Sequence, residues 1–228
     1  YYKGYRLSVI STGIGPDNID IVMNELDALV NIDLHTKEIK EQKKTLNIVR
    51  IGTSGSVQAD VPVHSFVISE MSLGIDGVLR FYRDNEMICD AAFEEAFIKE
   101  CHWTPLAARP YAVKASDELV DKLHTEGVTV KGVTLTANGF YGPQGRVLRL
   151  PIEMPTVNDE IARFRFGDYK IINYEMESAA IAGLAALMGH RATTICLIIA
   201  NRATGDASAD YKPHMKKLVE YTLNSLIR

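Results

Sequence analysis

Two carboxylates separated by a methionine stand at a predicted strand-to-helix junction, in residues 173–178. An alanine-rich stretch, residues 178–188, follows them. Asp and Glu are rarely buried unless something binds them, so Glu175 and Glu177 are candidate ligand-binding groups. Carboxylates accept hydrogen bonds from sugar hydroxyls, and Met176 offers a polarisable apolar surface to a sugar ring. A solvated helix start, where acidic residues favour the positive end of the dipole, is the alternative interpretation.

A second polar segment, residues 50–55, comes at the end of the predicted strand 46–51. Its glycines let backbone N–H groups approach an anion, Thr53 and Ser54 add hydroxyl donors, and Arg50 adds a bidentate cation. These residues predict a phosphate pocket, although the spacing is that of neither a Walker A loop nor a dinucleotide fingerprint. A tight turn with an arginine at its edge is the alternative.

Two further polar segments complete the set of candidate groups. The glycine-bounded loop 140–146 carries Gln144 and Arg146 two residues apart, which can read a flat amide edge, and Phe140, which can stack on it. Arg202 follows the apolar run 195–200. A guanidinium at the mouth of a buried strand usually has a partner or a ligand. An ordinary surface loop remains the alternative for 140–146.

Predicted strands and helices alternate along the chain, which indicates one α/β domain over residues 1–228. We expect strands at 6–11, 46–51, 66–69, 111–115, 128–137 and 195–200. We expect helices at 16–29, 90–100, 116–124, 159–166, 178–188 and 213–226. The sheet should be largely parallel or mixed, with its ligand beyond the carboxyl ends of the strands, where the polar segments stand.

The composition excludes several classes of function. No apolar run approaches the ~20 residues that a membrane span requires, and the net charge of −4 gives no reason to expect nucleic acid or an anionic membrane as a partner. Three cysteines without metal-type spacing predict reduced thiols and a cytoplasmic setting. A small anionic substrate remains compatible with this composition, because it responds to local charge.

Taken together, five motifs resemble the nucleoside phosphorylase family, and most closely its uridine phosphorylases. The motifs are residues 11–15, 50–55, 140–146, 173–178 and 201–202, and they occur in the family's order over nearly the whole chain. The pair Gln144 and Arg146 is similar to the family's uracil-reading signature. Purine-specific relatives carry Ser-Asp where this chain has Asn201 and Arg202, so the resemblance favours a pyrimidine.

The resemblance implies a central mixed sheet, partly closed into a barrel, and a role for each motif. The residues expected to bind phosphate are Arg50, Gly52 and Thr53. Those expected to bind ribose are Thr53, Glu175, Met176 and Glu177. Those expected to bind the base are Phe140, Gln144, Arg146 and Arg202. The catalytic residues among them are Arg50, Glu177 and Arg202.

The same resemblance implies phosphorolysis of uridine, and also of deoxyuridine as an open alternative, in pyrimidine salvage. It implies phosphate as a co-substrate, no redox cofactor or catalytic metal, and a homo-oligomer, dimer or hexamer, whose subunits share sites. Some relatives bind potassium at a turn that aligns with residues 14–18. The family's upstream phosphate loop is expected to be absent from this chain.

Three other functions stay open. A nucleosidase would use water in place of phosphate, and Arg50 favours the phosphorylase. A purine phosphorylase would need the acid that Arg202 replaces. A non-enzymatic nucleoside-binding protein on the same fold would have no reason to combine Arg50, Gln144 and Glu177.

Overall fold

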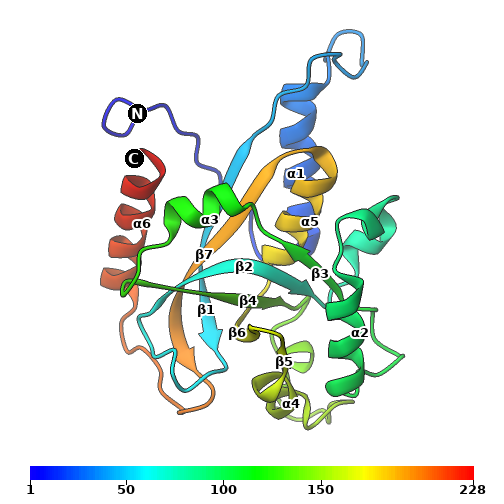
Figure 1. Cartoon of the computed structure of the whole chain (residues 1–228), viewed down its shortest axis with the longest axis vertical. Helices are drawn as coiled ribbons and strands as arrows, with labels where there is room; N and C mark the ends of the chain where they lie inside the picture. The colour runs from blue at the N-terminus through cyan, green and yellow to red at the C-terminus, as the bar shows by residue number, and fades with distance from the viewer.

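Seven strands form one mixed sheet at the centre of the molecule, in a computed structural model that describes residues 1–228 (Figure 1). The strand order is β1-β7-β2-β4-β6-β5, with β3 paired to β2. The strands are β1 (Asn47–Ser56), β2 (Phe66–Gly74), β3 (Tyr111–Lys114), β4 (Thr129–Thr136), β5 (Arg165–Phe166), β6 (Tyr169–Glu175) and β7 (Arg191–Asn201). This arrangement confirms the predicted α/β class and the mixed sheet.

The sheet curves until β1 meets β6, which closes five strands into a ring. β1 runs parallel to β7, while β2, β4 and β6 run parallel to one another. β7 pairs with β2, and β1 with β6, in the antiparallel sense. The β1–β6 contact pairs Gly55 with Tyr174 and Ser56 with Asn173, close to the carboxyl end of both strands. Segments that follow these two strands are therefore brought to one place.

Six α-helices flank the sheet. They are α1 (Pro16–Asn31), α2 (Ala91–Glu100), α3 (Asp117–Leu123), α4 (Val157–Arg163), α5 (Ser178–Met188) and α6 (Lys212–Leu226). In Figure 1, α3 and α6 lie together on one side of the sheet, and α1 packs on α5 on the other. Three short 3₁₀ turns complete the fold: η1 (Val78–Phe81), η2 (Asn85–Met87) and η3 (Gly142–Gln144).

Helix α5 is the central helix of the fold. It packs on four strands and on α1, and its residues 178–185 are all buried, which explains its alanine-rich sequence. A Cβ atom at Gly183 would come within 2.8 Å of the Leu79 side chain, so any other residue there would force Leu79 or the helix to shift. Gly189, with φ of 77°, ends the helix in the left-handed conformation.

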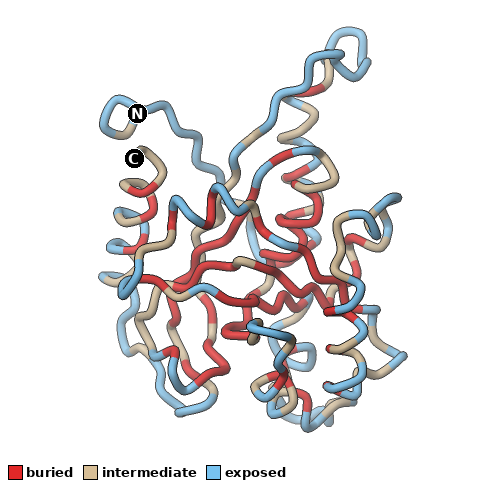
Figure 2. Tube along the Cα trace, viewed as in Figure 1, coloured by how far each residue is buried: buried red, intermediate tan, exposed pale blue.

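The predicted strand at residues 6–11 is wrong. These residues are exposed and pair with no strand, and Val9 is 92% accessible (Figure 2). A strand needs a neighbour to satisfy its backbone N–H and C=O groups, and no other segment of this chain lies beside these residues in a ladder. The predicted helix 159–166 also ends earlier, at Arg163, because Arg165 and Phe166 pair with β6 as strand β5.

The buried residues gather along the ring of strands, as the red parts of the tube at the centre of Figure 2 show. The largest buried cluster joins β2, β4 and β6 to α2 and α4, with Phe93, Phe97 and Phe164 in edge-to-face contact. No helix of the molecule combines the length and the apolar character that crossing a membrane would require.

Candidate active site

The junction between β6 and α5 holds Glu175 in a complete set of hydrogen bonds. Its Oε2 accepts from the backbone N–H groups of Glu177 and Ser178, each at 2.8 Å, and its Oε1 accepts from the Ser178 hydroxyl at 2.8 Å. The Thr136 hydroxyl, at the end of β4, donates to the same Oε1. Glu175 therefore caps the N-terminus of α5. This agrees with the alternative that the residue belongs to a helix start, except that the carboxylate is buried and not solvated.

Arg50 crosses from β1 to both carboxylates. Its Nη1 lies 3.1 Å from Glu175 Oε2, and its Nη2 pairs with Glu177 Oε2. The guanidinium lies over Gly52, where a Cβ atom would come within 2.5 Å of Arg50 Nη1. Burial alone would lower the pKa of Arg50, but the adjacent carboxylates raise it above its usual value. The arginine is thus a fixed cation, and Gly52 provides the space for it.

Glu177 joins three elements at one carboxylate. Its Oε1 accepts from the backbone N–H of Gly15, just before α1, at 2.7 Å, while its Oε2 faces Arg50. Burial raises the pKa of Glu177 above its usual value, although Arg50 acts in the opposite direction. Unlike Glu175, it has few protein donors, so acceptor capacity remains for a ligand.

The loop between β4 and α4 presents Gln144 as the centre of a second group. Its side-chain Oε1 accepts from Arg146 Nη1 at 2.6 Å and from Arg202 Nη2 at 2.9 Å. Its backbone carbonyl accepts from Arg202 Nη1 at 2.6 Å. Because both oxygens of Gln144 are engaged by arginines, its side-chain amide N–H groups stay available as donors.

The two guanidinium groups of this second group have no carboxylate partner within ion-pair distance. Arg202 lies over the buried ring of Tyr174, 4.8 Å from its centroid, and its Nε is buried without a hydrogen-bond partner. Burial, together with the nearby Arg146, lowers the pKa of Arg202 to about 10. This part of the site therefore holds uncompensated positive charge, which favours an anion.

The predicted residues fall into two groups. Arg50 and Gly52, from the middle of β1, meet Glu175 and Glu177 at the end of β6. Gln144, Arg146 and Arg202 converge beside Tyr174. The N–H of Arg202 donates to the Ser56 carbonyl at 2.9 Å, which ties the second group to the end of β1.

Three predicted residues are placed less tightly. Thr53 and Met176 are partly exposed, and neither makes a side-chain hydrogen bond to another predicted residue. Phe140 is 51% exposed, and the Arg146 guanidinium stacks on its ring at 3.8 Å. One face of Phe140 is therefore occupied by Arg146, and only the other face is free to stack on a ligand.

Several residues of the site were not predicted. Cys196, on β7, lies 3.4 Å from Arg50 Nη1, and burial raises the pKa of its thiol to about 11, so it stays neutral. Thr136 holds both Glu175 and the N–H of Ala179. Single hydroxyls and thiols in apolar strands carry no sequence signal of their own. The Gly15 N–H did carry such a signal, because Gly15 belongs to the motif at residues 11–15.

In residues 14–18, the turn that aligns with a potassium site in some relatives, the Ile14 carbonyl accepts from the Asn18 side-chain amide at 2.5 Å. Potassium binding at this turn stays a prediction. No cluster of three or more acidic, His or Cys side chains with metal-binding geometry occurs in residues 1–228.

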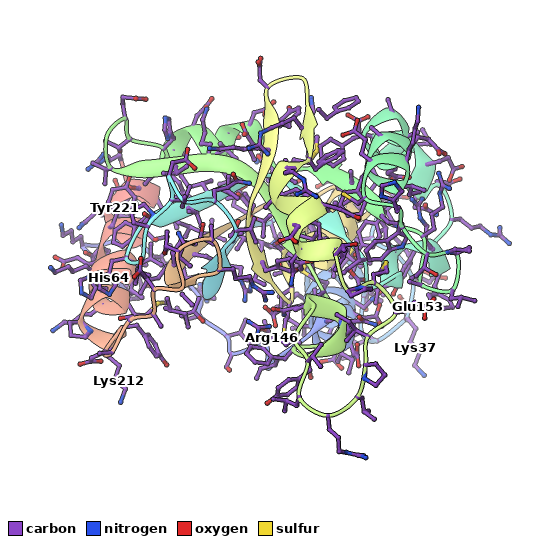
Figure 3. The ribbon with its side chains drawn as sticks, turned by 90° about the horizontal axis from the view of Figure 1, so that it is seen from below. Lys37, His64, Arg146, Glu153, Lys212 and Tyr221 are labelled. Carbon is purple, nitrogen blue, oxygen red and sulfur yellow. The ribbon has the colours of Figure 1, made fainter.

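A cavity of about 640 Å³ adjoins the second group and includes Arg146 in its wall. It lies between residues 104–107 and the loop 141–157, and its lining is mostly apolar. Figure 3 shows Arg146 on this loop, on the lower face of the molecule. Leu106, Leu148 and Leu150 are 83%, 81% and 67% exposed beside it. The cavity contains neither Arg50 nor the two carboxylates, so it extends outward from the second group.

Comparison with known proteins agrees with this geometry. The family model of the phosphorylase superfamily matches residues 1–226. The DeoD-type purine nucleoside phosphorylase of Listeria welshimeri is 27% identical over 209 residues, which are 91% of this chain and 69% of that protein. The uridine phosphorylase of Thermococcus kodakarensis is 25% identical over 211 residues, 90% of this chain and 61% of that protein.

Solved structures share the fold. A Trypanosoma brucei nucleoside phosphorylase, described as showing uridine phosphorylase activity, superposes with a TM-score of 0.82 at 24% identity, over 96% of this chain and 79% of that one. The uridine phosphorylase of Schistosoma mansoni gives a TM-score of 0.61 at 23% identity, over 95% of this chain and 70% of that one. With the family model matched over almost every residue, this chain belongs to the phosphorylase superfamily.

Proposed function

We propose that this chain catalyses the phosphorolysis of uridine to uracil and ribose 1-phosphate. One observation carries the proposal: two guanidinium groups, Arg146 and Arg202, converge on Gln144 without any carboxylate partner. Uracil offers two carbonyl oxygens and becomes an anion when it leaves the sugar. A site of amide and guanidinium donors matches both the neutral base and its anion.

The reaction separates charge between the two groups of the site. An oxygen of phosphate forms a bond to C1′ of the ribose while the C1′–N1 bond breaks and its electron pair moves to uracil. Positive charge builds on the sugar, as in glycoside hydrolysis. The base-side arginines stabilise the departing anion over its carbonyl oxygens, so N1 can be protonated later from solvent.

The sugar side of the site supplies the opposite charge. Glu177 keeps acceptor capacity beside Arg50 and accepts from the ribose hydroxyls in this proposal. As the ribose becomes cationic, the carboxylate interacts with it more strongly than with the ground state. Glu175, whose oxygens are occupied, serves the site by holding Arg50 and the start of α5.

Phosphate is assigned to Arg50, with Thr53 and the backbone at Gly52. Arg50 faces two carboxylates, so a phosphate dianion requires further cations, and these are expected from a partner subunit. Exposed apolar side chains beside the site, such as Leu106 and Leu148, support a second copy of the chain as that partner. The dimer or hexamer expected from the resemblance therefore remains part of the proposal.

A purine nucleoside is the second candidate, because relatives of this chain include DeoD-type purine nucleoside phosphorylases. Purine departure is helped by protonation at the ring, which requires an acid. The position after Asn201 holds Arg202, and this arginine faces Gln144 instead of a carboxylate. That contact favours a carbonyl-bearing pyrimidine.

The test is release of uracil from uridine in buffers with and without phosphate. We expect release only with phosphate, accompanied by ribose 1-phosphate. Arg50→Met should abolish the phosphate-dependent rate, while Arg83→Met, at an exposed arginine, should leave it unchanged. Equal release without phosphate would identify a nucleosidase, faster cleavage of inosine than of uridine a purine phosphorylase, and binding without cleavage a nucleoside-binding protein.

A further inference from the structure

We infer that Asn158, on helix α4, is a positioning residue for Gln144 and thereby for recognition of the base. The inference rests on the proposed function for the identity of the base. It concerns a residue outside the five motifs, in a part of the chain without an obvious chemical signal.

The contact is a hydrogen bond from a helix to the loop that carries Gln144. Asn158 Nδ2 donates to the Gln144 backbone carbonyl at 3.2 Å, and the Gly145 carbonyl lies 3.5 Å from the same nitrogen. Arg202 Nη1 donates to the same Gln144 carbonyl at 2.6 Å. The carbonyl is thus held from two sides, by α4 and by the segment after β7, and this double contact fixes where the Gln144 side chain begins.

The orientation of the Asn158 amide follows from its surroundings. Both nearby loop atoms are carbonyl oxygens, so only the nitrogen of the amide can face them. The other end of the amide, Oδ1, is buried and has no hydrogen-bond partner. A buried unpaired acceptor is rare in a folded protein, and it calls for an explanation. The explanation is the orientation of the amide: Nδ2 points at the Gln144 carbonyl, and this leaves Oδ1 on the side that has no donor.

Gly145 is the residue that allows this approach. A Cβ atom at position 145 would lie 2.2 Å from Asn158 Nδ2 and 2.8 Å from its Cγ. Gly145 also has a φ of 69°, which disfavours any residue with a side chain. All three atoms nearest to such a Cβ belong to Asn158, so glycine and asparagine are matched to one another at this contact.

Helix α4 is a firm base for the contact. Its residues Val157 and Ile161 are 4% and 0% exposed, and Phe164 beyond its end packs in the largest core cluster. The loop between Arg146 and α4 is in contrast exposed, with Leu148 81% accessible. Asn158 therefore fixes Gln144, the residue of this loop proposed to bind the base, to a helix that is anchored in the core.

The test is steady-state kinetics of Asn158→Ala, with KM measured for each substrate separately. Loss of one hydrogen bond, with the Arg202 contact retained, should raise KM for uridine about threefold to tenfold. KM for phosphate should not change, because Arg50 is held by β1, Glu175 and Glu177. Asp159→Ala, exposed on the next position of the same helix, is the matched control and should leave both values unchanged.

Two further variants separate hydrogen bonding from packing. Asn158→Asp keeps the size but cannot donate when ionised, so it should be at least as damaging as Asn158→Ala. Activity of Asn158→Asp equal to that of the unmodified protein would overturn the inference. Gly145→Ala should also raise KM for uridine, but it should do so less in the Asn158→Ala background, where only the strain of a left-handed alanine remains. Strict additivity of the two substitutions would contradict a direct contact.

Failure of this inference differs from failure of the proposed function. If the unmodified protein prefers inosine or another nucleoside, the proposed substrate is wrong, and the same variants can be measured with the preferred one. If Asn158→Ala then leaves the nucleoside KM unchanged, or raises both KM values equally, the positioning role is wrong whatever the substrate.

Discussion

Replacement of Arg202 tests the electrostatic half of the proposal most directly. Arg202→Met keeps an unbranched side chain over the Tyr174 ring but removes the charge and the two bonds to Gln144, of 2.6 Å and 2.9 Å. Loss of one preorganised donor aimed at developing charge costs about 10²–10³ in kcat, or about 2.7–4 kcal/mol. We expect a loss in this range for uridine, because no other cation than Arg146 faces the base.

The assay compares uridine with 5-fluorouridine. Fluorine withdraws electrons, so 5-fluorouracil leaves more easily as an anion and depends less on help from the protein. If Arg202 stabilises the leaving base, Arg202→Met should lose clearly less activity with 5-fluorouridine than with uridine. An equal loss for both substrates would refute the reasoning, because it would show that Arg202 acts only on binding or on folding of the loop.

The pH dependence provides a second readout of the same residue. Burial and the neighbouring Arg146 lower the pKa of Arg202 to about 10. The cationic form is the active one, so kcat/KM of the unmodified protein should fall as pH rises through about 10. That decline should be absent from Arg202→Met. The same decline in both proteins would assign it to another group.

Three further predictions concern other residues. Glu177→Gln should lower kcat for uridine roughly 10²–10³-fold. The same substitution should lower kcat for 2′-deoxyuridine by a smaller factor, because that substrate lacks one of the hydroxyls. Equal factors for both substrates would show that Glu177 does not bind the 2′ hydroxyl. Gln144→Ala should weaken uracil binding by about 1–3 kcal/mol, measured by calorimetry, and unchanged affinity would remove Gln144 from the base site. Burial raises the pKa of Asp76 to about 6, so the folded state holds this proton more tightly than the unfolded chain, and Asp76 lowers the free energy of unfolding as pH rises from about 4 to 6. Asp76→Asn should remove this loss, at most about 3 kcal/mol. Urea unfolding of both proteins at pH 4 and pH 8 measures it, and the two proteins would show no such difference if the carboxylate were solvated.

Glu177 and Arg202 could be predicted from their position just after a strand, whereas Arg50, expected at the end of the strand 46–51, lies inside β1, which continues to Ser56. Arg50, Glu177 and Arg202 are charged groups beside apolar runs, and the burial of Glu177 in the structure agrees with the expectation that such charges are paired or bind ligands. Periodicity also predicted α1, α5 and α6 to within a few residues. The local sequence was sufficient to predict these residues, because the apolar run and the charged residue lie in the same segment.

The residues that could not be predicted depend on contacts between distant segments. The apolar character of residues 6–11 predicts a strand, but pairing requires a neighbour, and this chain places none beside them. The two carboxylates look equivalent in sequence, yet Glu175 is occupied by donors from Thr136 and Ser178 while Glu177 is not. Asn158 acquires a role only because Gly145, 13 residues earlier, lies against it.

In the proposed function, the arrangement of charge in the site serves both to bind the nucleoside and to break its glycosidic bond. On the sugar side, Glu175 and Glu177 outnumber the single Arg50. On the base side, Arg146 and Arg202 have only neutral oxygens as partners. The bond that breaks lies between these two groups in the proposed function, and its electrons move toward the positive one. The field is present before the substrate binds, held by buried hydrogen bonds, so the protein need not reorganise when charge develops. A substitution that reverses either sign should therefore impair bond cleavage more than nucleoside binding.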